Sequence, residues 1–331
     1  MMLQFIAFYG LLQDITPKFL FSALPFFLRL LHFLRLSDSI GQRIKWGVCL
    51  MNIKLLAFDL DGTLLDDSKA IPAENVRALR TAADNNIITV PASGRIYRFM
   101  PEAVRSQLSA RYFITANGGE VYDALSDSVL YSAEIPLHRA VDVLDHFDTI
   151  DGIYDCYADN SGYMSRSFME KADDYFVDPA LNAMLHSYTL KTRTPVEDLR
   201  SFLIERGKSL QKLQMFFRDS EVRLHQLKIL PELFPDLVIS SSLANNIEIN
   251  SAEATKGQAL AALCAKLGID RSAVMAFGDG LNDLDMLRFA GTSVAMGNAD
   301  PLIRKTADYV TVSNNDAGLA KALSRFGLCS L

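Results

Sequence analysis

The chain has 331 residues, a length that favours two domains and allows a sizeable hydrophobic core. Half of its residues are hydrophobic and 22% are charged, which excludes an intrinsically disordered chain. The formal charge of −6, with no block of lysine and arginine, argues against a nucleic-acid partner. The four cysteines are scattered without a CxxC spacing, so we expect them to be reduced and buried and the protein to be cytoplasmic.

Residues 1–50 differ from the rest of the chain. Residues 19–36 are rich in phenylalanine and leucine, but a proline, two arginines and a histidine interrupt them. A membrane span needs about 20 predominantly apolar residues, so an amphipathic helix on a membrane surface is the functional interpretation. The alternative, which we favour, is that Met51 is the true start and that residues 1–50 are upstream sequence. We therefore expect membrane association only if this extension is real.

Residues 55–66 contain the first candidate site. A continuous apolar run ends in Asp59 and Asp61, which are followed by glycine and threonine. Such a run is typical of a strand buried on both faces of a parallel sheet, and chemistry in open α/β sheets lies beyond the carboxyl ends of such strands. Side chains two residues apart on a strand point to one side, and two carboxylates there need a cation, a shared proton or solvent. The glycine spacing excludes a calcium EF-hand loop.

The segments that follow alternate between helix and strand. A helical pattern from Pro72, a strand over 87–90, a helix to about Gln107 and a strand over 112–115 predict an α/β fold with a doubly wound parallel sheet. From about Pro136 the pattern becomes a mixture typical of an inserted α+β module, in which we expect one helix over 168–186 and another from Thr194. Alternation resumes at 247–249. The expected parts are an N-terminal extension over 1–50, a first core part over 51–135, the inserted module over 136–242 and a second core part over 243–331.

Three further polar segments follow predicted strands or open the next helix. Ser93 and Gly94 offer a hydroxyl and backbone N–H groups suited to a phosphate. Lys256 begins a helix, where its charge would neutralise a phosphate. Residues 278–283 place Asp279, Asn282 and Asp283 at one strand end. Taken singly, the first two are common as turn or surface chemistry, and the last is more specific. Their combination with Asp59 and Asp61 indicates a reaction centre.

These four segments resemble the four motifs of the haloacid dehalogenase-like (HAD) hydrolases. The matching stretches are Asp-Leu-Asp-Gly-Thr-Leu, Ser-Gly-Arg, Lys-Gly and Gly-Asp-Gly-Leu-Asn-Asp. The long insertion between the second and third motifs is similar to the α+β cap of the Cof-type (class IIB) sugar-phosphate phosphatases. The resemblance extends from Met51 to the C-terminus. The stretch before Lys256 departs from it, because the family often has proline and glycine there.

The resemblance implies a role for each residue of the motifs. Asp59 would be the nucleophile that forms an aspartyl-phosphate, and Asp61 would be the general acid and base. Mg²⁺ would be bound by the carboxylate of Asp59, the backbone carbonyl of Asp61, Asp279 and Asp283, since hard oxygen ligands suit this ion. The phosphoryl group would be held by Ser93, the Gly94 N–H and Lys256, with Asn282 helping to orient them, and Asn117 and Arg95 are further candidates near the mouth of the site.

The function implied is a Mg²⁺-dependent phosphatase whose partner is a small phosphorylated metabolite, most simply a sugar phosphate. One alternative is a phosphomutase acting on phosphosugars, which would use the same aspartyl-phosphate. A second alternative is a non-catalytic ligand-binding protein that retains the HAD fold. The presence of every motif carboxylate argues against that last interpretation.

Overall fold

Strand β1 (Leu55–Asp59) lies in the interior of an eight-stranded sheet, between β12 (Val274–Gly278) and β2 (Ile88–Ala92). All five residues of β1 are buried, and both neighbours run parallel to it, as the apolar run predicts. The structure is a computed structural model that describes residues 52–176, 178–184 and 189–330. The predictions for residues 1–50, including the start at Met51 and the membrane-surface helix, lie outside this range.

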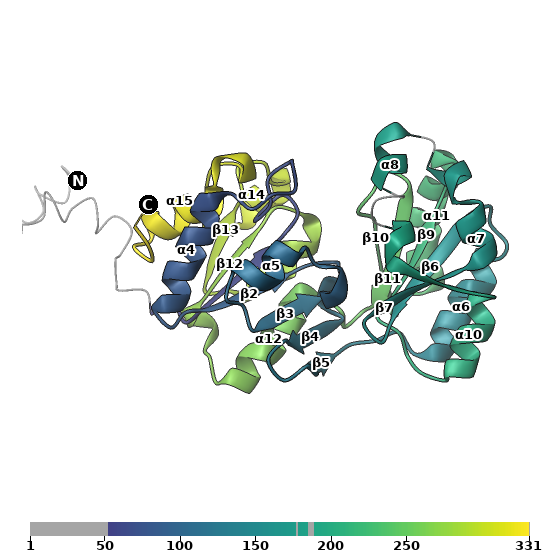
Figure 1. Ribbon diagram of the computed structural model, residues 1–331, viewed down its shortest axis with the longest axis horizontal. Coiled ribbons are helices and arrows are strands. Elements are labelled where there is room, and N and C mark those ends of the chain that lie inside the picture. The colour runs from purple at the N-terminus through teal and green to yellow at the C-terminus, as the bar shows by residue number, and fades with distance from the viewer. Residues whose placement is uncertain (1–51, 177, 185–188, 331) are drawn as a thin grey trace, which may run out of the picture. The chain divides into compact units, whose positions relative to one another are not determined.

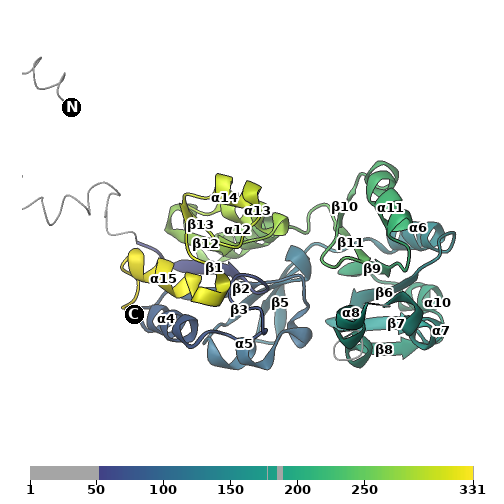
Figure 2. The same cartoon turned by 90° about the horizontal axis from the view of Figure 1, so that it is seen from above.

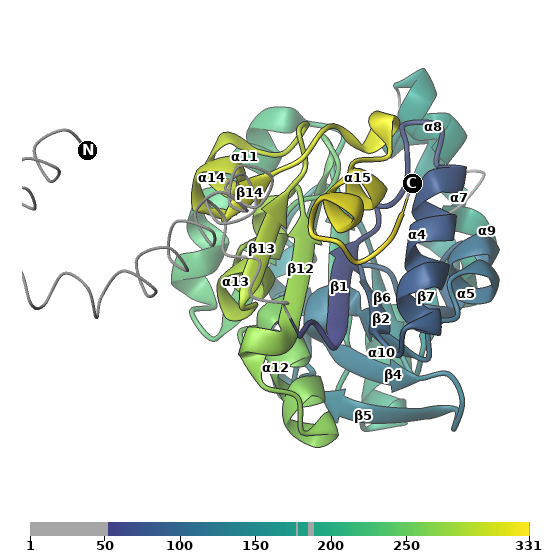
Figure 3. The ribbon, with the colours of Figure 1, turned by 90° about the vertical axis from the view of Figure 1, so that its left-hand side faces the viewer.

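The sheet is mainly parallel, and its order is β14-β13-β12-β1-β2-β3-β4-β5 (Figures 1 and 3). Neighbouring strands run parallel from β14 to β3, whereas β4 and β5 add an antiparallel hairpin that we did not predict. The remaining strands of this sheet are β3 (Tyr112–Thr115), β4 (Glu120–Asp123), β5 (Ser128–Ser132), β13 (Thr292–Ala295) and β14 (Tyr309–Val310).

Helices cover both faces of this sheet, as expected for a doubly wound α/β fold (Figure 2). Helices α12 and α13 pack on one face, where their leucines and alanines join the side chains of β1, β2 and β12 in one buried cluster. The opposite face is covered by α4, α5 and α15. The helices are α4 (Ala73–Asp84), α5 (Glu102–Gln107), α12 (Lys256–Leu267), α13 (Leu284–Phe289), α14 (Pro301–Thr306) and α15 (Gly318–Arg325).

The inserted α+β module is built on a second sheet of six strands, in the order β10-β11-β9-β6-β7-β8. One face of this sheet packs on α6, α10 and α11 in a separate apolar cluster. Its strands are β6 (Ile153–Ala158), β7 (Ser161–Ser165), β8 (Arg193–Val196), β9 (Lys212–Phe216), β10 (Leu237–Ser240) and β11 (Asn246–Ser251). Its helices are α6 (Leu137–Phe147), α7 (Arg166–Glu170), α8 (Pro179–Met184), α9 (Leu190–Thr192), α10 (Leu199–Arg206) and α11 (Ser220–Leu233).

The structure differs from the expected course of the chain at β11. We expected residues 247–249 to return to the first sheet, within a core part that starts at residue 243. Instead, β11 pairs antiparallel with β9 and β10 in the six-stranded sheet. Its alternation explains this: Ile247 and Ile249 join the apolar cluster, while Glu248 and Asn250 alternate with them. Such alternation suits a sheet with one apolar face better than a strand buried in apolar surroundings on both sides.

Two other segments of the inserted module were assigned incorrectly. We expected a helix from Thr194, but this residue lies in β8, and α10 begins only after Asp198, whose side chain accepts a hydrogen bond from the backbone N–H of Ser201. We expected one helix over residues 168–186, but the described part forms α7, a 3₁₀ turn (Ala172–Tyr175) and α8. Proline at position 179 stands at the start of α8, the position in a helix that tolerates it.

No helix in the described part of the chain has the length and apolar character needed to cross a bilayer. The described cysteines are free: Cys156 and Cys264 are buried, as expected, whereas Cys329 is half-buried.

Candidate active site

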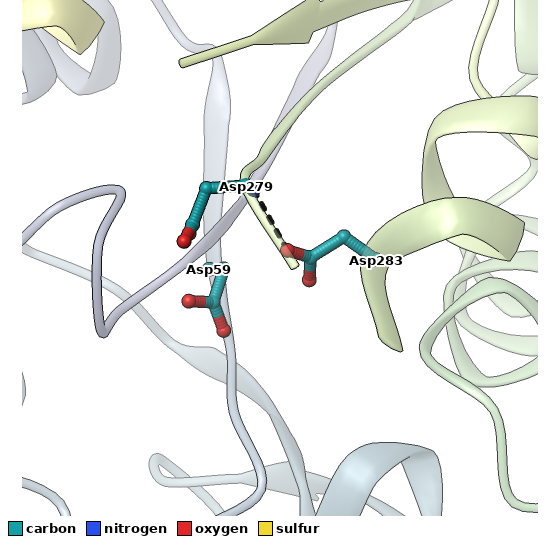
Figure 4. Close-up of side chains that lie close together, drawn as sticks. All are labelled: Asp59, Asp279 and Asp283. Carbon is teal, nitrogen blue, oxygen red and sulfur yellow. Dashed lines mark hydrogen bonds between the residues drawn. The ribbon is translucent and has the colours of Figure 1, made fainter. Parts of the chain in front are cut away.

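Three aspartates from two adjoining strand ends form a cluster (Figure 4). Asp59 ends β1, Asp279 follows β12, and Asp283 ends a 3₁₀ turn (Leu281–Asp283). Each offers a carboxylate oxygen, and these oxygens lie within 4.8 Å of one another. The cluster forms because β1 and β12 are parallel neighbours, so the loops after them start at the same edge of the sheet.

Lys256 is buried between two of these carboxylates. Its ammonium group donates to Asp59 Oδ1 and to Asp283 Oδ1, the latter at 2.6 Å. Lys256 is the first residue of α12, and the Thr255 side chain caps this helix by accepting from the Gln258 N–H. Burial alone would lower the pKa of Lys256, but Asp283 and Asp59 outweigh it and raise that pKa, so the side chain is charged.

One ammonium group does not balance three carboxylates. Burial, together with Asp283 and Asp279, raises the pKa of Asp59 well above its ordinary value despite the opposing effect of Lys256. Burial is also the main reason why the pKa of Asp279 is raised to about 6, although Thr63 donates a hydrogen bond to it at 2.6 Å. A divalent cation would remove this excess of negative charge. An all-oxygen set of donors fits Mg²⁺ rather than zinc.

Two glycines let the backbone approach the cluster closely. Gly62 has a φ of +87°, which favours glycine, and a Cβ atom there would lie 2.3 Å from Asp279 Oδ2. At Gly278, a Cβ atom would lie 2.5 Å from the Cβ of Asp283. Any side chain at either position would displace a carboxylate of the cluster.

The carboxylate of Asp61 has partners of its own. It forms ion pairs with Arg95, at 3.1 Å, and with Lys69, at 2.8 Å. Burial works to raise its pKa, but these two cations prevail and lower it. The chain leaves β1 at Asp59, and Asp61 forms an isolated bridge with Leu65. Asp61 is therefore held in its ionised form.

The predicted phosphate-binding residues lie on adjoining loops. Ser93 follows β2 and is buried, and its hydroxyl oxygen accepts from the Arg95 N–H at 3.2 Å. A Cβ atom on Gly94 would lie 2.8 Å from Asn117 Oδ1, and the Asn282 amide donates to the same oxygen at 3.3 Å. Asn117 thus lies between the loop after β2 and the loop after β12.

The structure brings Asp59, Lys256, Asp279 and Asp283 into one cluster and leaves Asp61 beside it. The sequence patterns did not point to roles for Thr63, Lys212 and Glu248. Lys212 donates to the carbonyl oxygen of Gly94, and Glu248 accepts from Asn117. The signal for Glu248 was available, because an acidic residue between two isoleucines of a strand faces away from their apolar cluster.

Residues 56–323 match the haloacid dehalogenase-like hydrolase family. The chain is 33% identical over 279 residues to a 5-amino-6-(5-phospho-D-ribitylamino)uracil phosphatase of Bacillus subtilis (strain 168), covering 84% of this chain and 97% of that protein. It is 32% identical over 286 residues to the phosphatase YwpJ of the same organism, covering 81% and 98%.

Solved structures share the fold. A phosphatase of the HAD superfamily from Bacteroides thetaiotaomicron has a TM-score of 0.69 and 26% identity, covering 86% of this chain and 98% of that one. A HAD subclass IIB sugar phosphatase also has a TM-score of 0.69, covering 83% and 100%. Its identity of 23% shows a common fold alone.

Proposed function

Because the chain belongs to the haloacid dehalogenase-like hydrolases, of the Cof type, and is a phosphatase, we propose that it hydrolyses small phosphorylated metabolites in a Mg²⁺-dependent reaction. One observation carries this proposal: three carboxylates and a buried lysine meet at the carboxyl end of a parallel sheet. Oxygen donors for a cation and an ammonium group for an anion lie side by side there. A phosphoryl group with its metal ion requires both.

Asp59 is the nucleophile in this proposal. A carboxylate oxygen of Asp59 attacks phosphorus, the bond to the leaving oxygen breaks, and an aspartyl-phosphate forms. Water then attacks this phosphorus and releases inorganic phosphate, which regenerates Asp59. Bound Mg²⁺ would neutralise charge on the phosphoryl oxygens. Asp59, Asp279, Asp283 and the backbone carbonyl of Asp61 would hold the ion.

Asp61 moves the protons. It gives a proton to the leaving oxygen and takes one from the attacking water. Arg95 and Lys69 keep it ionised in the structure, which is the form that accepts a proton. Protonation for the first step therefore requires that bound substrate weaken these two ion pairs. Ser93, the Gly94 N–H and Lys256 would hold the phosphoryl oxygens, and Asn282 would orient them.

The substrate class we propose is the phosphate monoester of a sugar or sugar alcohol. Support comes from the Bacillus subtilis relative, whose name specifies a phosphorylated ribityl group. Several other relatives are named only as phosphatases, so the panel of substrates should be broad. It should include hexose and pentose phosphates, 5-amino-6-(5-phospho-D-ribitylamino)uracil and a generic aryl phosphate.

The first prediction concerns Asp59. Asp59→Asn should abolish Mg²⁺-dependent release of phosphate from an aryl phosphate, because an amide is a much poorer nucleophile than a carboxylate. The melting temperature should stay within a few degrees of the wild type, since the change relieves repulsion in the cluster. Asp285→Asn, an exposed position on α13, is the matched control and should retain activity. Turnover by the Asp59→Asn protein would refute the assignment of the nucleophile.

Incubation of the protein with a phosphohexose separates hydrolysis from the phosphomutase alternative. A mutase would convert a phosphohexose into its isomeric phosphate, whereas a phosphatase yields free phosphate and sugar. The non-catalytic alternative is set aside by the family and the phosphatase relatives.

A further inference from the structure

One face of the six-stranded sheet packs on the helices in an apolar cluster, and the opposite face carries buried charged side chains beside a smaller apolar cluster that includes Phe216. Leu213, Ile247 and Ile249 point to the helices. Lys212 and Glu248 alternate with them and are only 2% and 6% exposed. Charged side chains are rarely buried unless they are paired, so their partners indicate what they do.

Lys212 connects the six-stranded sheet to the loop after β2. Its ammonium group forms an ion pair with Glu248 Oε1 at 3.1 Å and donates to the carbonyl oxygen of Gly94 at 3.2 Å. That carbonyl belongs to the same planar peptide group as the Arg95 N–H, which donates to the Ser93 hydroxyl oxygen. Fixing the carbonyl therefore also fixes the N–H group that orients Ser93.

Glu248 reaches two other loops through Asn117. Its Oε2 atom accepts from the Asn117 amide at 3.1 Å. The Asn117 Oδ1 atom in turn accepts from Asn282, and its backbone N–H donates to the carbonyl oxygen of Ser93 at 3.0 Å. Burial opposes ionisation of Glu248, but Lys212 and hydrogen bonds from Ser242 and Asn117 lower its pKa and keep it charged.

We propose that Lys212 and Glu248 are positioning residues for phosphoryl transfer, because together they hold the Ser93-Gly94 turn and, through Asn117, the Asn282 amide. This inference rests on the proposed function and extends it to the inserted module. With the ion pair in place, the turn after β2 and the loop after β12 have fixed positions relative to each other. Without it, they would be free to shift, and a misplacement of about 1 Å in such a site can cost about 100-fold in rate.

A second ion pair of the inserted module serves as a control. Arg139 on α6 donates to Asp236 at 2.6 Å and 2.8 Å and to Asp142 at 2.7 Å, and its guanidinium group lies over the Phe234 ring. Loss of this pair removes the same two charges from the module without changing the contacts of Lys212 and Glu248 with the loops of the site.

The experiment compares Lys212→Met, Glu248→Gln and the double variant with an Asp236→Asn/Arg139→Met protein. The assay measures kcat and KM for an aryl phosphate at saturating Mg²⁺, together with the melting temperature. Each single change should lower kcat by about 10- to 100-fold and alter KM much less, since the phosphoryl-holding groups are misplaced rather than removed. The double variant should be no slower than the slower single variant, because both changes break the same connection. The control pair should keep kcat within about twofold even where its melting temperature falls.

Asn117→Gly breaks the same connection without leaving a buried charge, so it tests the inference even if a single charge variant does not fold. Glycine tolerates the φ of +60° that Asn117 adopts. The kcat of the Asn117→Gly protein should fall as well.

Unchanged kcat in these variants, multiplicative losses in the double variant, or an equal loss of kcat in the control pair would each overturn the assignment. A wild-type protein without Mg²⁺-dependent phosphate release would instead contradict the proposed function itself.

Discussion

Lys256 shows how a single residue sets the charge balance of the site. Its fully buried ammonium group pairs with Asp59, at the end of β1, and with Asp283, in the turn after β12. Residues 59 and 256 are 197 positions apart in the sequence. From the sequence, Lys256 resembled a common surface lysine, and its proposed role depended on the neighbouring motifs. Lys256 differs from a surface lysine because it is buried between two carboxylates, and a buried ammonium group must be paired.

Glu120 is a buried acid whose ionisation should affect stability. It lies on β4, where it accepts hydrogen bonds from Gln211 and, at 3.5 Å, from Thr115. Burial is the main reason why its pKa is raised to about 7 from an ordinary value of 4.5, and Glu134 adds to the effect. The unfolded chain therefore ionises this group at a lower pH than the folded protein does.

The prediction is that Glu120 makes the protein less stable as the pH rises from about 4.5 to about 7. Below that window the group is neutral in both states, and above it the folded protein must hold a buried charge. Relative to Glu120→Gln, the wild type should lose up to about 3 kcal/mol of unfolding free energy across the window. Urea unfolding at several pH values measures this difference. Glu253→Gln, at an exposed position, should show no such trend, and parallel curves for wild type and Glu120→Gln would contradict the prediction.

At the scale of elements, the start of α12 determines where Lys256 lies. The Thr255 hydroxyl accepts from the Gln258 N–H at 3.2 Å, and Lys256 is the next residue after this cap. Thr255→Ala should cost about 1 kcal/mol of unfolding free energy, the usual effect of losing such a cap. It should also lower kcat, because fraying of the first turn moves the ammonium group. Thr255→Ser retains a capping hydroxyl and should behave like the wild type in thermal unfolding and in the phosphatase assay. Equal stability of the Ala and Ser proteins would contradict a capping role.

The elements also show how far local patterns predict structure. Strands β1 and β12 were predicted well, because a continuous apolar run followed by acidic and glycine residues fits a buried parallel strand. Strand β11 was assigned to the wrong sheet. Its residues show a strand pattern, but nothing in a short strand specifies its partners, which are set by contacts between segments distant in the sequence.

At the scale of the whole molecule, Mg²⁺ should stabilise the folded chain. The unfolded chain scatters Asp59, Asp279 and Asp283, so the ion binds the folded state preferentially. At a concentration 100 times its dissociation constant, it should add about 2.7 kcal/mol of unfolding free energy. Calorimetry with and without EDTA measures the corresponding rise in melting temperature. Asp279→Asn should reduce this rise strongly and Asp285→Asn should not. An equal rise in melting temperature for the Asp279→Asn and Asp285→Asn proteins would show that the ion binds at another site.

The sequence by itself determined the family, the fold class and the identity of the clustered acids, because each motif is a local arrangement of a strand end and its loop. Only the tertiary structure decided that Asp61 pairs with Arg95 and Lys69, that Lys256 joins two carboxylates, and that Lys212 and Glu248 reach the loops of the site. The reason is physical: local patterning sets which residues end a strand, whereas side-chain partners depend on strand order and on the burial that folding creates.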